Sequence, residues 1–121
     1  MNYNKPVLIS IDPNAGAVYD QIADAITVRI ATGETAQGER LPAARDLADA
    51  LGINVHTVLH AYQRLRDDGL VELRRGRGAV VIGASAIGEV QHAVDAVIRA
   101  AKSSGLSEAA LIALIRKGHR A

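Results

Sequence analysis

Side chains that donate hydrogen bonds gather in two short stretches of this chain. His56, Thr57 and His60 recur at helical spacing in the first stretch, and Arg75 and Arg77 flank a glycine in the second. Side chains of these types donate hydrogen bonds to base edges and to phosphates. We therefore expect a nucleic-acid surface that consists of Arg45, Asn54, His56, Thr57, His60, Arg64, Arg75, Gly76 and Arg77.

Two helices separated by a tight turn must position the first stretch. Apolar residues recur at helical spacing up to Leu51, and Gly52 suits the left-handed conformation that ends a helix. Asn54 then supplies an N-cap for a second helix over residues 55–68. The apolar face of this helix predicts a helix-turn-helix with a polar face left for a partner. The predicted core positions are Val58, Ala61, Tyr62 and Leu65.

A scaffold helix and a hairpin complete the predicted domain. An apolar stripe over residues 18–32 predicts a helix, residues 34–39 a loop, and residues 7–11 a short strand. Residues 70–73 and 79–82 are typical of strands joined by a basic turn. We predict an α+β, mainly helical fold, with an N-terminal winged helix-turn-helix over residues 1–83 and a short C-terminal two-helix dimerisation appendage over residues 84–121.

The appendage carries more apolar surface than two short helices can bury on each other. Residues 83–85 are typical of a hinge, residues 86–102 of a helix, and Ser107 of the cap of a second helix. Short helices depend on packing, so we expect a second copy of the chain to cover this surface. The alternative is that the pair packs back on its own winged helix. The expected interface residues are Ile87, Val90, Val94, Val97, Ile98, Leu111, Leu114 and Ile115.

Short motifs follow one another in a set order between Ile9 and Ile82. They are Asp12-Pro13, Val18-Tyr19-Asp20-Gln21-Ile22, Ile30-Ala31-Thr32-Gly33, Gly38-Glu39-Arg40-Leu41-Pro42-Ala43-Ala44-Arg45-Asp46-Leu47-Ala48, Leu51-Gly52-Ile53-Asn54, Thr57-Val58, Ala61-Tyr62, Leu65, Gly69-Leu70-Val71 and Gly76-Arg77-Gly78. In this order and spacing they resemble the GntR-type bacterial transcription regulators. The short appendage is most similar to the YtrA-type branch, whose regulators add only two short helices.

The resemblance implies a homodimeric transcription regulator that binds double-stranded DNA. We expect a repressor that blocks its own promoter region at an inverted-repeat operator. The chain departs from the family pattern at Leu59, where the wider family often has an arginine that reads guanine. His56 and His60 therefore become the candidates for readout, whether of bases or of phosphates, and Arg45 is the only charged contact in its turn.

Composition sets broad limits on the class of protein. The chain has 121 residues, 49% of them hydrophobic, which suits one modest core. A net charge of +1 is small for a DNA-binding protein, so the placement of the arginines matters more than their number. Cysteine is absent, the start of the sequence is polar, and no apolar run approaches the length of a membrane span. We expect a cytoplasmic protein with no membrane partner.

Other functions have weaker support in the sequence. His56 and His60 are four residues apart and suit a metal, but no further ligand lies near, so we expect no metal and no cofactor. No catalytic motif is present, which predicts that the protein is not an enzyme. The main alternative is a winged helix that contacts proteins without specific DNA binding. Any small-molecule effector would have to bind between subunits or near Ser85, because the helix pair is too small for a pocket.

Overall fold

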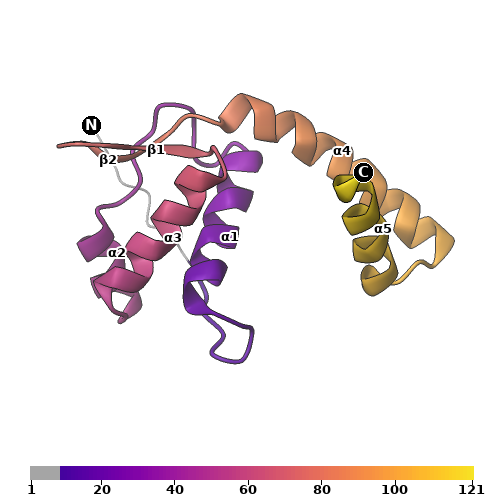
Figure 1. Cartoon of the computed structure of the whole chain (residues 1–121), viewed down its shortest axis with the longest axis horizontal. Coiled ribbons are helices and arrows are strands. Elements are labelled where there is room, and N and C mark those ends of the chain that lie inside the picture. The colour runs from indigo at the N-terminus through magenta and orange to yellow at the C-terminus, as the bar shows by residue number, and fades with distance from the viewer. Residues whose placement is uncertain (1–8) are drawn as a thin grey trace. The chain divides into compact units, whose positions relative to one another are not determined.

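Helices precede and follow a short hairpin in the computed structural model, which describes residues 9–121 (Figure 1). In chain order the elements are α1 (Val18–Ala31), α2 (Ala44–Leu51), α3 (Val55–Asp67), β1 (Val71–Arg74), β2 (Gly78–Val81), α4 (Ala84–Ser104) and α5 (Glu108–Arg120). They divide into two units, Met1–Gly88 and Glu89–Ala121, and α4 spans the division. This order confirms the predicted winged helix-turn-helix followed by a helix pair.

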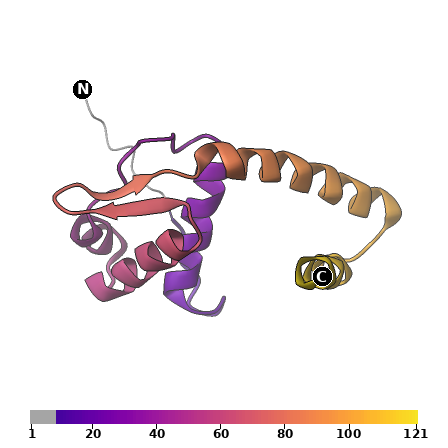
Figure 2. The same cartoon turned by 45° about the horizontal axis from the view of Figure 1, so that its top comes forward.

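Helix α3 forms the centre of the first unit, because both α1 and α2 pack against it (Figures 1 and 2). All four predicted core positions of α3 are buried. They meet an apolar stripe of α1 and the inner face of the wing, and the full burial of an aliphatic side chain contributes roughly 1.5–3 kcal/mol. The fully buried larger side chains are Ile22, Ile26, Ile30, Val58, Leu65, Val71 and Val81.

Local signals set the turn between α2 and α3. Gly52 ends α2 in the left-handed conformation, with φ 68° and ψ 36°. The side chain of Asn54 caps α3 and accepts a hydrogen bond from the His56 N–H at 2.8 Å. Both features confirm the predicted turn, and they place His56 in the first turn of α3.

The wing is a two-stranded antiparallel sheet with a further segment beside it (Figure 2). β1 and β2 pair in a register that places Val71 opposite Val81. The N–H of Leu41 donates to the carbonyl of Ala79 at 2.8 Å, and the N–H of Val81 donates to the carbonyl of Glu39 at 2.9 Å. These bonds fasten the chain that enters α2 to the wing, an arrangement that the sequence did not predict.

The start of α4 belongs to the first unit, which corrects the predicted hinge at residues 83–85. Ala84 is already helical, and its N–H donates to the Gln37 side-chain oxygen at 3.1 Å. Ala84 and Ile87 both pack against the core of the first unit. Ile87 is therefore partly covered within the first unit, and its place in a subunit interface stays a prediction. The contacts between residues divide the chain after Gly88.

The second unit leaves most of its apolar side chains exposed. Ser107 caps α5 as predicted and accepts a hydrogen bond from the Ala110 N–H at 3.1 Å. Among the described residues of this unit, Ala101 is the only buried one, and Leu111 is half-buried. No helix within residues 9–121 has the length and apolar character needed to cross a membrane. Exposed fractions of 37% to 60% are found for Val90, Val94, Val97, Ile98, Leu106, Ile112, Leu114 and Ile115.

The short strand predicted over residues 7–11 is not observed where it can be examined. Residues 7 and 8 lie outside the described part of the chain, and residues 9–11 form no strand. The segment is attached to α1 by Gln21 instead. Its side-chain amide donates to the carbonyl of Asp12 at 2.7 Å and accepts from the Asp12 N–H at 2.9 Å.

Candidate nucleic-acid interface

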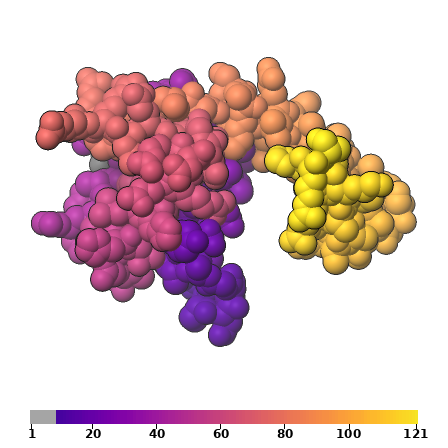
Figure 3. All heavy atoms as spheres, in the orientation of Figure 1, coloured from indigo at the N-terminus to yellow at the C-terminus, as the bar shows by residue number. Residues whose placement is uncertain are grey.

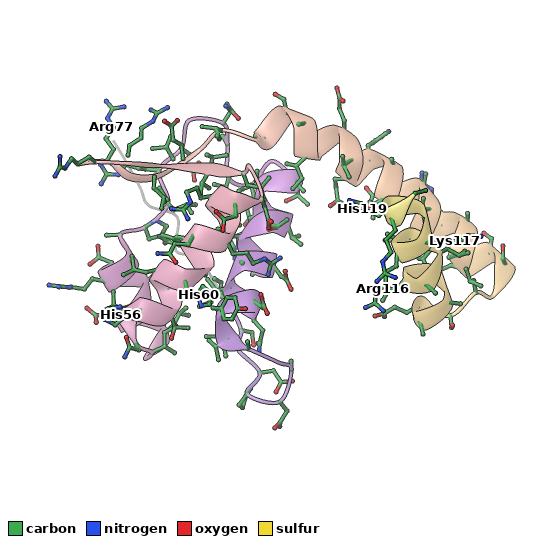
Figure 4. The ribbon with its side chains drawn as sticks, in the orientation of Figure 1. His56, His60, Arg77, Arg116, Lys117 and His119 are labelled. Carbon is green, nitrogen blue, oxygen red and sulfur yellow. The ribbon has the colours of Figure 1, made fainter. Side chains whose placement is uncertain are left out.

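One exposed flank of α3 faces α1 and is occupied by contacts within the protein. The His60 ring stacks on the ring of Tyr19, with 3.8 Å between centroids and 14° between planes. Figure 4 shows His60 between α3 and α1, whereas His56 lies at the N-terminal end of α3. The stack holds His60 on the α1 side of the helix, and its predicted role in DNA readout stays a prediction.

Arg64, one turn further along the same flank, is enclosed by carboxylates. Its guanidinium lies 3.0 Å from Asp20, 2.7 Å from Asp24 and 3.5 Å from Asp68. A further hydrogen bond from Arg64 reaches the main-chain carbonyl of Asp20 at 3.3 Å. The hydrogen bond to Asp24 raises the pKa of Arg64 above its ordinary value. This arginine joins α3 to α1, and its predicted contact with DNA stays a prediction.

The other flank of α3 presents a row of side chains without a protein partner. His56, Leu59 and Gln63 are all exposed, and within residues 9–121 none of their side chains takes part in a hydrogen bond or an ion pair. Positions three and four residues apart are neighbours on a helix surface. We call these three residues the free row. Thr57, in the first turn of the same helix, is half-buried.

The arginines of the first unit separate into two groups. Arg66 pairs with Asp67 at 3.2 Å, and Arg74 pairs with Glu72 at 3.0 Å. Arg29 is likewise engaged, by an ion pair to Glu34. The arginines that are exposed and form no ion pair with any described residue are Arg40, Arg45, Arg75 and Arg77. Three of them were predicted site residues; Arg40 was missed, because residues 34–40 carry no signal for the bridge between Arg40 and β2.

Three of the unpaired arginines belong to elements along one edge of the first unit. Arg45 is in the first turn of α2, and Arg75 and Arg77 belong to the wing turn, which Gly76 completes. In Figures 1 and 2 the wing turn, α2 and the N-terminal end of α3 lie along one edge of the first unit, away from α1. Figure 4 places Arg77 at the tip of the wing, and Figure 3 shows this tip projecting from the body of the unit.

A hydrogen bond from a buried tyrosine holds the two helices of the turn in place. The Tyr62 hydroxyl donates to the carbonyl of Pro42 at 2.7 Å, just before α2 begins. The Tyr62 side chain is only 4% exposed, and burial raises the pKa of its phenol. The bond therefore fixes the start of α2, and with it Arg45, relative to α3.

The geometry suits binding to a polyanion. Within residues 9–121, no group of three or more His, Cys, Asp or Glu side chains is arranged to hold a metal ion. A helix with a row of exposed side chains that lack protein partners, beside arginines without ion pairs, is the usual arrangement of a helix-turn-helix that enters a DNA groove. The fold and the site thus define a winged helix of the nucleic-acid-binding type.

Comparison with known proteins gives the family. The family model described as "Bacterial regulatory proteins, gntR family" matches residues 18–81, more than half of the chain. The chain belongs to this family. The "HTH-type transcriptional repressor YtrA" of Bacillus subtilis is 35% identical over 75 residues, which cover 61% of this chain and 58% of that protein. The match therefore spans little more than half of the curated relative.

Solved structures extend the similarity to the appendage. "YtrA from Sulfolobus acidocaldarius, a GntR-family transcription factor" is 30% identical, with a TM-score of 0.55, and the match covers 93% of this chain and 96% of that one. These relatives confirm the predicted resemblance to YtrA-type regulators. "S. agalactiae BusR in complex with its busAB-promotor DNA" is 22% identical, with a TM-score of 0.54 over 88% of this chain and 58% of that one, and shares the fold.

Proposed function

We propose that this chain is a sequence-specific, DNA-binding transcription regulator that inserts α3 into the major groove. The observation that carries the proposal is the free row on α3 beside four arginines without ion pairs. In a helix-turn-helix the second helix reads base edges through its N-terminal residues. Asn54, His56 and Thr57 lie at that end, and Gln63 lies further along the same helix.

The arginines serve the phosphate backbone. Arg45 would contact the phosphates beside the groove from the start of α2, and Arg75 and Arg77 would contact them from the wing. Arg40, next to the wing, joins this set. Contacts of this kind position a protein on the duplex without reading its sequence, and they make binding dependent on salt.

The regulator acts as a homodimeric repressor in this proposal. The exposed apolar residues of α4 and α5 would pack against the same face of a second copy. Such a dimer carries two α3 helices related by a twofold axis, and its operator is an inverted repeat. The Bacillus relative is described as a repressor, which supports that direction of control. The protein would act in the cytoplasm, and any small-molecule effector would bind between the subunits or near Ser85.

Selection from random duplex DNA with the full chain tests this proposal. We expect one sequence to be enriched and to bind far more tightly than random DNA. Failure to bind any duplex at low salt would favour the alternative, a winged helix that contacts another protein.

Variants then separate phosphate contacts from base contacts. Arg45→Ala and Arg77→Ala should weaken the binding of selected and random DNA alike, and each should lower the salt slope by about one, because each removes one cation from the phosphate backbone. His56→Ala should cost about 1–3 kcal/mol for the selected sequence only. Arg66→Ala is the matched control, because Arg66 is already paired with Asp67. Its replacement should change neither the salt slope nor the affinity for the selected sequence. Affinities measured by fluorescence anisotropy over a range of salt concentrations give both results.

A further inference from the structure

An apolar side chain stands in the middle of the free row. Leu59 is 41% exposed and lies on α3 between His56 and Gln63, which are both exposed. The other large apolar side chains of α3 are buried or half-buried. Leu59 is not among the residues that pack against the core of the first unit. Its side chain is therefore partly exposed on the flank of α3 where the partner is expected.

The chemistry of leucine restricts what it can recognise in a major groove. It neither donates nor accepts hydrogen bonds, so it gains nothing from the nitrogen and oxygen atoms of the base edges. The C5-methyl group of thymine is the one apolar group among those edges. Cytosine has a hydrogen atom in place of that methyl group, and both purines offer polar groups. A leucine placed against polar groups would take away their water without returning a hydrogen bond.

We propose that Leu59 is a specificity-determining residue that selects thymine in the operator by packing against its C5-methyl group. This inference rests on the proposed function, because it requires α3 to lie in the groove. His56 and Gln63 are its neighbours along the row, and their polar side chains read adjacent positions. The position read by Leu59 is thus flanked by positions read through hydrogen bonds.

The test replaces thymine by uracil, which lacks only the methyl group. The full chain first selects its operator from random duplex DNA. Each thymine of that operator is then replaced singly by uracil, and the affinity of each duplex is measured. At one thymine of each half-site, replacement by uracil should lower the affinity of the protein for the duplex roughly fourfold, which corresponds to the burial of one methyl group. In the Leu59→Ala variant, uracil at that position should cost nothing further.

A second leucine provides the matched control. Leu73 on β1 is 39% exposed, nearly the same fraction as Leu59, but it lies on the wing. Leu73→Ala should leave the fourfold effect of uracil unchanged. Gln63→Ala should also leave it unchanged while reducing the preference at a neighbouring position. Circular dichroism checks the fold, which Leu59→Ala should preserve because alanine favours helix and the side chain is exposed.

The outcomes distinguish this inference from the proposed function. If an operator is selected but no thymine responds to uracil, the contact by Leu59 is wrong while sequence-specific binding stands. The contact is also wrong if the effect of uracil persists in Leu59→Ala. If no sequence is enriched from the random duplexes, the proposed function fails, and the thymine contact fails with it.

Discussion

At the scale of single residues, Arg64 gathers three carboxylates around one guanidinium. Two of them, Asp20 and Asp24, belong to α1, so these ion pairs join α3 to the helix behind it. The side chain of Arg64 is 31% exposed, and solvent and salt weaken its interactions accordingly. Its contribution is to the stability of the first unit and to the position of α3.

Replacement of Arg64 by alanine should lower the free energy of unfolding by about 1 kcal/mol, the upper end for exposed ion pairs. The loss should shrink at about 1 M salt, where such pairs are screened. Urea denaturation at low and high salt measures both effects. Arg66→Ala, which breaks an ion pair to an adjacent residue, should change stability much less. If Arg64→Ala folds normally but lowers the affinity for DNA as much as Arg77→Ala does, Arg64 contacts DNA directly.

At the scale of elements, the turn between α2 and α3 depends on one backbone conformation. Gly52 has φ 68°, and a Cβ atom added there would meet no atom within 4 Å. The conformation, not the surrounding space, therefore requires glycine. Any L-residue with a side chain would need roughly 1–2 kcal/mol to adopt it.

Gly52→Ala should accordingly lower the free energy of unfolding by about 1–2 kcal/mol. Gly88 offers the opposite control, because it lies inside α4 without a left-handed φ and with no atom near its added Cβ. Gly88→Ala should stabilise the chain by about 0.5–1 kcal/mol. Thermal or urea unfolding of the two variants provides the comparison. Equal effects of the same sign would show that helix propensity, and not the left-handed turn, governs both sites.

At the scale of the whole molecule, the two units have separate tasks in the proposed mechanism. The first unit has its own core, and α4 contributes Ala84 and Ile87 to it. A truncation that preserves the core must therefore end after Gly88, not after Gly83. The remaining part, residues 89–121, carries the exposed apolar side chains.

The truncated chain of residues 1–88 should fold, sediment as a monomer and bind one half-site weakly. The full chain should sediment as a dimer, and its operator half-sites should have centres about one helical turn, roughly 10 base pairs, or a multiple of it apart. In a dimer, binding of one α3 helix raises the effective concentration of the second α3 helix at the other half-site. The second unit therefore raises the affinity for the operator without contacting DNA. Sedimentation velocity and footprinting measure these properties. A dimeric truncated chain would move the interface into the first unit.

A point variant tests the same interface in the intact chain. Ile98→Glu places a charge on the exposed face of α4, where isoleucine is 38% exposed, and should shift the full chain towards monomer without unfolding it. Val28→Glu makes a similar change at an exposed position of α1 and should leave the dimer intact. If Ile98→Glu remains a dimer, this face of α4 is not the interface.

The sequence alone determined the features that depend on neighbours along the chain. Gly52, Asn54 and Ser107 mark helix ends because their signals act within one turn of the backbone. The spacing of the apolar residues predicted which face of α3 is buried, and Val58 and Leu65 are fully enclosed. Helix positions and the winged fold followed from these local rules.

The tertiary structure decided which exposed flank of α3 remains free. Periodicity separates the buried from the exposed arc of a helix, but it treats His60 and Gln63 alike. Their difference comes from Tyr19, which stacks on His60 from α1, about forty residues earlier in the chain. The same holds for Arg64, whose partner Asp24 has a sequence separation of 40 residues. Such contacts depend on how the helices pack, and a side chain's type and spacing do not specify them.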